Sequence, residues 1–272
     1  MSKPVVVTGA FDDLRSRDVR LFQEAARLGP VIVLLFPDEL IRAQTETSPK
    51  FPWAERIYLL KSLRFVTDVM PFGSTSGIDA LPDIRGLSPA GWIDAENSSN
   101  PRRRLFCQQN GLEYRVFTNG HLAGFPQLPF PAGGLRRKKV IVTGCYDWLH
   151  SGHVRFFEEV STHGDLYVVV GHDANIRLLK GQGHPLQSQD ERRYMVGAVR
   201  YVTQALVSSG NGWLDAEPEI QRIKPDIYAV NEDGDRGGKR EYCAKAGLEY
   251  LVLKRVPAPG LPARSSTDLR GF

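Results

Sequence analysis

Two histidines, His150 and His153, stand three residues apart in the segment T-G-C-Y-D-W-L-H-S-G-H, which follows a short apolar run ending at Thr143. If this run is a strand and a helix begins near Ser151, both imidazoles lie at the carboxyl edge of a sheet, beside a helix N-terminus. Free backbone N–H groups and the helix dipole favour anions there, and imidazole donors can stabilise charge on a phosphoryl group under attack. The segment therefore predicts a phosphate site, with close backbone approach at Gly152.

Two other interpretations of the histidine pair stay open at this point. His-x-x-His on a helix can bind a metal, but no third cysteine, histidine or carboxylate stands at ligand spacing, so we expect no metal held by protein side chains. The histidines could also be plain surface or capping residues. Their position directly after the first strand favours chemistry over both alternatives.

The chain matches itself when it is shifted by 135 residues, and a shift of 136 extends the match toward the C-terminus. The superposed pairs include Thr8 on Thr143, Asp12 on Asp147, Arg56 on Arg192, Cys107 on Cys243 and Gly111 on Gly247. Self-similarity that continues from residue 8 to residue 114 predicts the same fold twice.

Within each copy, short β-rich runs alternate with helical patterns. In the second copy the runs are 140–143, 166–170, 205–207, 227–230 and 250–253, and S-Q-D-E at 188–191 is a capping box. Apolar strands separated by helices predict a parallel sheet covered on both faces. We therefore expect two doubly wound α/β domains, 1–124 and 138–272, joined by a linker at 125–137 that is rich in Pro and Gly.

Composition limits the partners and the compartment. The excess of 35 Lys and Arg over 31 Asp and Glu suits phosphorylated ligands and is too diffuse to predict nucleic-acid binding. No apolar run approaches the length of a membrane span, and the N-terminus lacks the pattern of a signal peptide. We expect a cytoplasmic protein with no membrane partner. Its three cysteines form no C-x-x-C pair and are expected to be reduced.

The motifs of the second copy, taken in order, resemble the H-x-G-H nucleotidylyltransferases, and most closely the cytidylyltransferase branch typified by glycerol-3-phosphate cytidylyltransferase. Besides the histidine segment, the resemblance includes Lys180 after the second strand, Arg192 in E-R-R-Y, N-E-D-G at 231–234 and R-S-S-T at 264–267. The tandem arrangement resembles that of ethanolamine-phosphate cytidylyltransferase. The fold implied is a pair of Rossmann-like nucleotidyltransferase domains.

This resemblance implies transfer of a nucleotidyl group, CMP from CTP, to a small phosphorylated acceptor with release of pyrophosphate. Two alternatives remain: an adenylyltransferase that uses ATP, because such enzymes share H-x-G-H, and a non-catalytic nucleotide-binding or sensor protein. Magnesium is expected to arrive with the nucleoside triphosphate. N-E-D-G replaces the Gly-Asp-Asp-Trp segment typical of the family, so the choice of base stays open.

Most of the site residues are carried over from family motifs. The implied catalytic residues are His150, His153, Lys180, Arg192, Ser266 and Thr267. The residues implied to bind the nucleotide are Thr143, Gly144, Cys145, Tyr146, Gly152, Asn231, Asp233, Arg255, Arg264 and Ser265. The acceptor pocket is expected to include Asp147, Trp148, Lys180 and Trp213, and the alternative for Trp213, which follows Gly212, is an anchor that packs a loop. Because the repeat partner of Arg192 persists in the first copy, part of its role is expected to be structural.

The first copy keeps the framework and lacks the residues that chemistry requires. Arg15, Arg17 and Asp18 stand in the places of the two histidines and the glycine of H-x-G-H. An aspartate at that position repels a phosphate. We expect a degenerate copy that forms an intramolecular pseudo-dimer with the active one. The alternative is a regulatory anion site at Arg15, Arg17 and Arg20.

Overall fold

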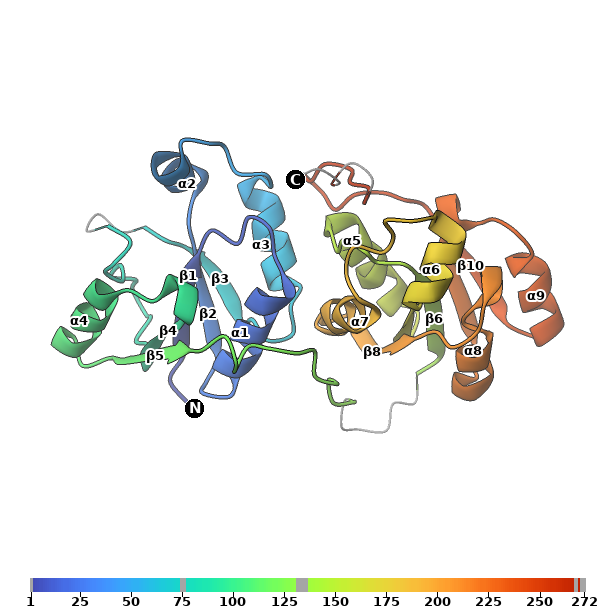
Figure 1. Ribbon diagram of the computed structural model, residues 1–272, viewed down its shortest axis with the longest axis horizontal. Coiled ribbons are helices and arrows are strands. Elements are labelled where there is room, and N and C mark those ends of the chain that lie inside the picture. Colours follow the sequence, from blue (N-terminus) through green and yellow to red (C-terminus); the bar gives the residue numbers. More distant parts are fainter. Residues whose placement is uncertain (1, 74–76, 131–136, 267–268, 270–272) are drawn as a thin grey trace. The chain divides into compact units, whose positions relative to one another are not determined.

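The computed structural model describes residues 2–73, 77–130, 137–266 and 269 (Figure 1). The chain divides into two compact units, Met1–Gly124 and Phe125–Phe272, called here the first and the second unit. Each unit holds one five-stranded parallel sheet. None of the helices in the described ranges is long and apolar enough to cross a bilayer.

The first unit alternates strands and helices. Its elements are β1 (Val5–Gly9), α1 (Ser16–Ala26), β2 (Val31–Leu35), α2 (Asp38–Thr45), α3 (Trp53–Lys61), β3 (Asp68–Pro71), β4 (Gly91–Ala95), the 3-10 turn η1 (Glu96–Ser98), α4 (Pro101–Gln109) and β5 (Glu113–Phe117).

The second unit runs through a similar series. Its elements are β6 (Lys139–Gly144), α5 (Ser151–Ser161), β7 (Asp165–Val170), α6 (Asp173–Lys180), α7 (Gln189–Gly197), β8 (Val202–Val207), η2 (Gly212–Leu214), α8 (Glu217–Ile223), β9 (Ile227–Asn231), η3 (Glu232–Gly234), α9 (Lys239–Ala246) and β10 (Glu249–Leu253). All five predicted strand runs lie within these strands. The predicted cap is also present, since the Ser188 hydroxyl accepts the Glu191 N–H at 3.3 Å.

The two sheets have equivalent strand orders, β3-β2-β1-β4-β5 in the first unit and β8-β7-β6-β9-β10 in the second. In the second sheet the chain moves from β6 to β7 and β8 on one side, then crosses back to β9 and β10 on the other. The order therefore reverses at β6, between β7 and β9. In open parallel sheets, ligands bind in the crevice at the carboxyl ends of the strands at such a reversal.

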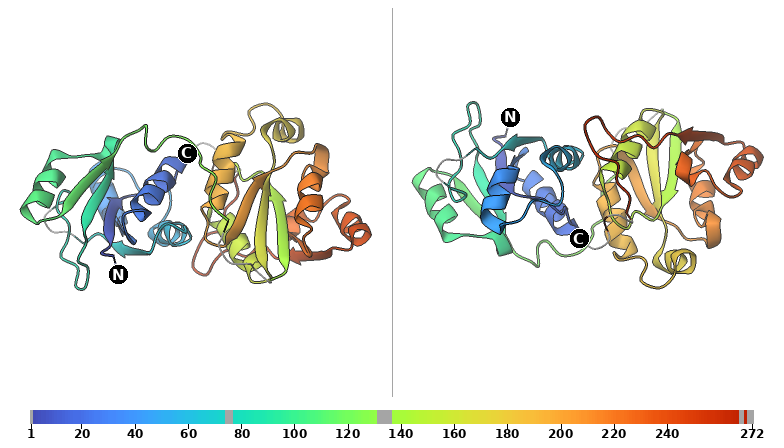
Figure 2. Two further views of the ribbon diagram at one scale, coloured as in Figure 1. Left: turned by 90° about the horizontal axis from the view of Figure 1, so that it is seen from below. Right: turned by 90° about the horizontal axis from the view of Figure 1, so that it is seen from above.

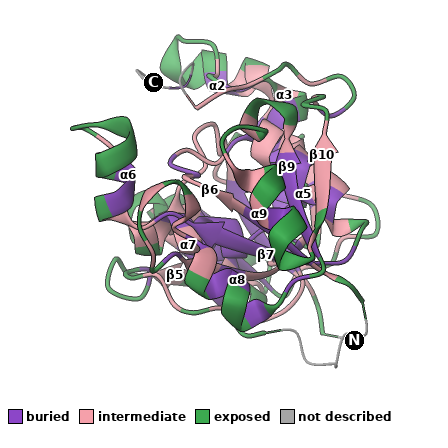
Figure 3. Cartoon of the chain, turned by 90° about the vertical axis from the view of Figure 1, so that its right-hand side faces the viewer, coloured by how far each residue is buried: buried purple, intermediate pink, exposed green. Residues whose placement is uncertain are grey.

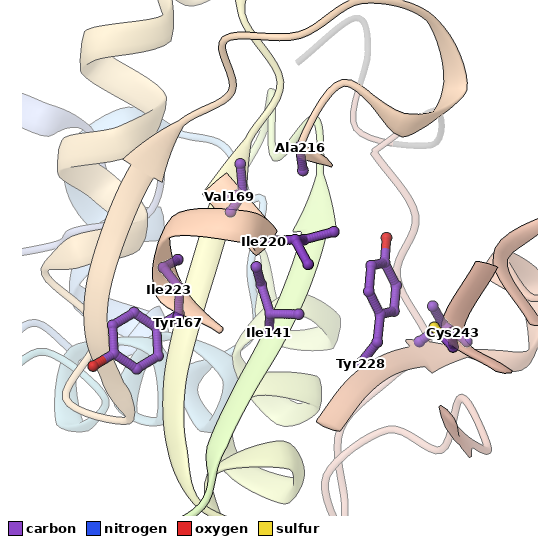
Figure 4. Close-up of a cluster of buried hydrophobic side chains, with 9 residues drawn as sticks. Ile141, Tyr167, Val169, Ala216, Ile220, Ile223, Tyr228 and Cys243 are labelled. Atoms are coloured by element: carbon purple, nitrogen blue, oxygen red, sulfur yellow. The ribbon is translucent and has the colours of Figure 1, made fainter. Parts of the chain in front are cut away.

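Helices lie on both faces of the second sheet (Figure 2). On one face, Ile220 and Ile223 of α8 and Cys243 of α9 pack with Ile141 of β6 and Val169 of β7 (Figure 4). Figure 3 shows the central strands of this sheet buried, while the outer sides of the helices are exposed. Burial on both faces explains why these strands are continuous apolar runs in the sequence.

The first unit departs from the prediction of a doubly wound domain between β3 and β4. Where the second unit has α8, the described part of this segment contains no helix, although Ile84 and Leu87 still pack on a core that includes Val6 and Leu34. Gly86 has a φ of +83°, which a right-handed helix cannot contain. The apolar spacing is kept, and the irregular backbone covers the sheet in place of the helix.

The segment predicted as a linker begins against α7. The carbonyl of Phe125 accepts a hydrogen bond from Arg193 at 2.9 Å, and its ring lies 6.2 Å from that of Tyr194. A Cβ added at Gly197 would lie 3.5 Å from Leu128 Cδ1. Residues 131–136 of the predicted linker lie outside the described residues.

Candidate active site

A cavity of about 550 Å³ lies at the carboxyl ends of β6 and β9, where the strand order reverses. Most of the predicted site residues line it. They are Thr143, Gly144, Cys145, Tyr146, Asp147, Trp148, His150, Gly152, His153, Lys180, Asn231, Asp233, Arg255 and Ser266. Motifs spread over more than 120 positions of the sequence, from Thr143 to Ser266, therefore meet at one edge of the sheet.

The floor of the cavity begins with a strained turn after β6. Tyr146 has a φ of +53°, and its ring folds back over Gly144, where an added Cβ would lie 2.7 Å from Tyr146 Cζ. The first unit repeats this turn with Phe11 at a φ of +44° over Gly9. The Thr-Gly-x-aromatic part of the motif is therefore structural: the glycine leaves room for the aromatic ring in both units.

The two histidines are stacked at the start of α5. His150 caps the helix, since its Nδ1 accepts the Gly152 N–H at 3.1 Å, and the centroids of the His150 and His153 rings are 3.8 Å apart. The Tyr146 ring packs against His153 in an edge-to-face arrangement, with the two ring centroids 5.2 Å apart. Because Nδ1 of His150 is an acceptor, the neutral ring carries its proton on Nε2. In this structure Nε2 is shielded from solvent.

His153 is held in the neutral form. Burial lowers the pKa of His153 to about 3, and the nearby charges of Arg255 and Lys180 act in the same direction, against a hydrogen bond with the Trp148 backbone. Its Nδ1 is shielded from solvent and has no hydrogen-bond partner among the described residues. At neutral pH His153 therefore carries no positive charge, while Lys180, Lys239 and Arg255 bring positive charge to the cavity.

Asp147 has a structural role besides lining the cavity. Its carboxylate accepts the backbone N–H groups of Leu186, at 2.8 and 2.9 Å, and Gln187, at 3.0 Å. Asp12 does the same in the first unit, with two successive N–H groups before α3 at 2.7 and 2.8 Å. The aspartate thus ties the loop after the first strand to the loop that precedes a helix, which places Leu186 on the cavity wall.

Arg192 was expected to be catalytic, but it does not line the cavity and its contacts lie within the fold. The side chain is fully buried, and its guanidinium donates to four acceptors: the carbonyls of Gln187 at 3.0 Å, Cys145 at 2.7 Å and Gly171 at 2.8 Å, and the carboxylate of Asp173 at 2.6 Å. Arg56 makes the equivalent set of bonds in the first unit. This shared network explains why the arginine persists where the histidines do not.

The C-terminal segment closes one side of the cavity. Arg255 donates to the Asp233 carboxylate at 2.5 Å and to the Arg264 carbonyl at 2.6 Å. Ser266 lines the cavity, whereas Arg264 and Ser265 are not among its lining residues. Thr267, expected to be catalytic, lies outside the described residues.

One further predicted residue lies differently from expectation. Trp213 is 53% exposed beside the start of α9 and does not line the cavity, because η2 turns its ring toward Gly238. Cys145 lines the cavity, but burial raises the pKa of its thiol, and its carbonyl is the atom that Arg192 binds. Lys180 is exposed at the last turn of α6 and lines the cavity as expected.

Several lining residues were not predicted from the sequence. They are Phe156, His184, Leu186, Ala229, Val230, Gly234 and Lys239. For Lys239 a signal was present, since the 136-residue shift pairs it with Arg103 of the first copy. Gly234 belongs to the N-E-D-G segment at 231–234. The other positions carry no motif, because only packing brings them to the wall.

The described ranges contain no group of three or more His, Cys, Asp or Glu side chains that could hold a metal ion. The two carboxylates at the cavity are already bound, Asp147 to backbone N–H groups and Asp233 to Arg255. These side chains do not form a magnesium site by themselves.

The corresponding place in the first unit is filled by interactions within that unit. Arg15 pairs with Asp13, Arg17 donates to Asn119, and Arg20 pairs with Glu24 at 2.8 Å. Burial raises the pKa of Asp18 to about 6. The three arginines are thus already engaged, which argues against the alternative of a regulatory anion site there.

Parts of this chain are similar to known proteins. A family model described as Cytidylyltransferase-like matches residues 141–271. An FAD synthase of Ferroglobus placidus is 35% identical over 43% of this chain and 75% of its own length, and an FAD synthase of Methanocella paludicola is 32% identical over 48% and 93%. The bifunctional protein HldE of Aliarcobacter butzleri is 30% identical over 51% of this chain, which spans 29% of that longer protein.

Proposed function

We propose that this chain, a nucleotidyltransferase that belongs to the cytidylyltransferase-like family, transfers an adenylyl group from ATP to a small phosphorylated acceptor and releases pyrophosphate. The reaction takes place in the second unit. The observation that carries the proposal is the stacked pair of His150 and His153 at the start of α5, on the floor of a cavity with Lys180 and Arg255 on its walls.

In the proposed reaction, a phosphate oxygen of the acceptor attacks the α-phosphorus of ATP. The bond from that phosphorus to the bridging oxygen breaks, and pyrophosphate leaves with the electron pair. Negative charge grows on the leaving pyrophosphate and on the oxygens around the α-phosphorus. The Nε2–H of His150 would donate to those oxygens, with His153 stacked on its ring, and Lys180 would supply positive charge at the cavity wall.

Adenylyl transfer is preferred to the CMP transfer that the resemblance implied. The FAD synthases among the relatives make a product that contains an adenylyl group joined to flavin mononucleotide, whereas none of the relatives described above is named for CTP. The departure of 231–234 from the family's usual segment fits a change of base. Magnesium, expected as the companion of the triphosphate, would be held by phosphate oxygens.

The first unit is proposed to be a diverged copy of the second, with residues 125–137 joining them and the two units acting as an intramolecular pseudo-dimer. The equivalent strand orders, the aromatic turns at Phe11 and Tyr146 and the shared arginine networks support common descent. The framework has been kept because the fold needs it. The missing residues are those that only the reaction requires.

Nucleotide preference tests the proposal. A ligand that binds only the native state raises its stability by mass action, so ATP with magnesium should raise the melting temperature more than CTP, GTP or UTP at equal concentration. Pyrophosphate release should then be measured with the preferred nucleotide and a panel of phosphate monoesters that begins with flavin mononucleotide. A larger shift with CTP would return the function to cytidylyl transfer, and no nucleotide effect with no pyrophosphate release would point to a protein without this activity.

Gly152→Ala should lower turnover while the fold is kept. An added Cβ would lie 3.0 Å from His150 Cε1 and 3.4 Å from the Arg264 carbonyl oxygen, so the His150 ring has to shift. Displacement of a reacting group on this scale costs roughly tenfold to a hundredfold in rate. Gly73→Ala is the matched control, because nothing lies within 4 Å of its added Cβ. Pyrophosphate release and thermal unfolding are compared, and equal turnover in both variants would contradict the tight packing at His150.

A further inference from the structure

Lys239 is a cavity residue to which no role has been given so far. It is the first residue of α9, it is half-buried, and its Nζ donates to the Gly234 carbonyl at 2.6 Å. A cation in the first turn of a helix is disfavoured by the helix dipole. Burial also lowers the pKa of Lys239, and the charges of Asp235 and Asp233 offset this effect only in part. Its position is therefore unfavourable for an ammonium group unless an anion offsets the cost.

The carboxylates nearest to Lys239 are engaged elsewhere. Asp233 binds Arg255 at 2.5 Å, while Asp235 binds Arg240 at 2.9 Å and accepts the Tyr250 hydroxyl at 2.8 Å. Within the described ranges, no carboxylate lies at ion-pair distance from Lys239. The second unit thus holds a partly buried lysine at its cavity without an ion pair of its own.

In the first unit, the residue equivalent to Lys239 is paired with a carboxylate of the same unit. The 136-residue shift places Arg103 on Lys239 and Asp94 on Val230. In the first unit, Arg103 Nη1 contacts both carboxylate oxygens of Asp94, at 2.9 and 3.0 Å, and both side chains are buried. The second unit keeps the cation and replaces the carboxylate with Val230, which lines the cavity. The change removes an internal anion at the place where a substrate would lie.

The topology places a second cation on the other side of the histidines. Lys180 follows β7 and Lys239 follows β9, and these strands flank β6, which leads to the histidine pair. In-line displacement puts the attacking and leaving oxygens on opposite sides of the phosphorus. Both the acceptor and the pyrophosphate are anionic, so each side of the histidine pair needs positive charge.

We propose that Lys239 binds a phosphate oxygen of a substrate, in the place where the first unit holds the Asp94 carboxylate. This inference rests on the proposed function, since it names a residue for the substrates of that same site. The phosphate belongs either to the nucleotide or to the acceptor, and the two sources are separated by experiment.

The test uses the full-length chain and Lys239→Met, which keeps the length of the side chain and removes its charge. Binding of ATP with magnesium, pyrophosphate and flavin mononucleotide is measured by calorimetry. The variant should bind at least one of these probes about tenfold more weakly, as expected for loss of a charge-assisted hydrogen bond. Weaker ATP and pyrophosphate binding assigns the contact to the nucleotide, and weaker binding of flavin mononucleotide alone assigns it to the acceptor.

Two controls separate binding from folding. Lys245→Met changes an exposed lysine on the same helix and should leave all affinities unchanged. The ligand-free K239M protein loses the hydrogen bond to the Gly234 carbonyl and no ion pair among the described residues, so it should melt within a few degrees of the wild type. A purely structural lysine would give the opposite result, a lower melting temperature with normal affinities.

A second pair of variants tests whether Lys239 reaches the position of the missing carboxylate. Val230→Asp should destabilise the ligand-free protein less in the wild-type background than in the K239M background, because the new carboxylate can pair with the lysine as Asp94 pairs with Arg103. Equal losses of stability in the wild-type and K239M backgrounds would show that Lys239 does not reach the position of the missing carboxylate. If K239M binds every probe as the wild type does, the inference is wrong and the proposed function stands; if the wild type binds none of them, both are wrong.

Discussion

Replacing His150 with asparagine should reduce turnover on the order of 100- to 1000-fold, the effect expected for removal of one preorganised donor to developing charge, about 2.7–4 kcal/mol. Asparagine is the informative choice because His150 is also the N-cap of α5, where its Nδ1 accepts the Gly152 N–H. An asparagine side chain caps helices well. His150→Asn therefore removes the Nε2–H donor while the cap is retained, and His150→Ala removes both.

The comparison of these two variants separates chemistry from stability. We expect equal losses of turnover in pyrophosphate-release assays, with a lower melting temperature only for His150→Ala. His153→Asn should also abolish most turnover, because it removes the partner ring of the stack. Arg15→Ala, at the matching position of the first unit, should leave turnover unchanged. If the first-unit change proved more damaging than the histidine changes, the active half would have been assigned wrongly.

Arg192→Met should destabilise the second unit by about 3–5 kcal/mol, as expected when one member of a buried ion pair is removed and its partners are left buried. Three backbone carbonyls and the Asp173 carboxylate lose donors in this variant. Those carbonyls belong to the ends of β6 and β7 and to the loop before α7, so the cavity wall loses its support. Unfolding by denaturant, followed by circular dichroism, measures the loss.

Matched variants at Arg56 and Arg222 test whether the role of Arg192 is structural. Arg56→Met should destabilise the first unit by a similar amount, since Arg56 makes the same set of bonds there. Arg222→Met changes an exposed arginine at the end of α8 and should alter the free energy of unfolding by no more than about 0.5 kcal/mol. An Arg192→Met protein with wild-type stability and no turnover would instead support the direct catalytic role that the family resemblance implied.

The repeat allowed the sequence to separate framework from chemistry, and the structure gives the reasons. Gly144 and Asp147 recur in the first copy as Gly9 and Asp12, and both pairs make the same local contacts. Such contacts join residues close in sequence or fix one loop to the next, so the pattern of identical residues reveals them. The absence of α8 from the first unit was not predictable from apolar spacing, because Gly86 changes the backbone while the spacing stays the same.

The sequence by itself determined the alternation of strands and helices, the internal repeat and the position of His150 and His153 after the first strand of the second copy. These features follow from local periodicity and from the order of motifs, and both can be read along the sequence. Only the tertiary structure decided that Arg192 serves the fold, that burial keeps His153 neutral and that Lys239 faces the cavity. Burial, charge and hydrogen bonding at these positions depend on residues far apart in the sequence that meet only when the sheet and its helices pack together.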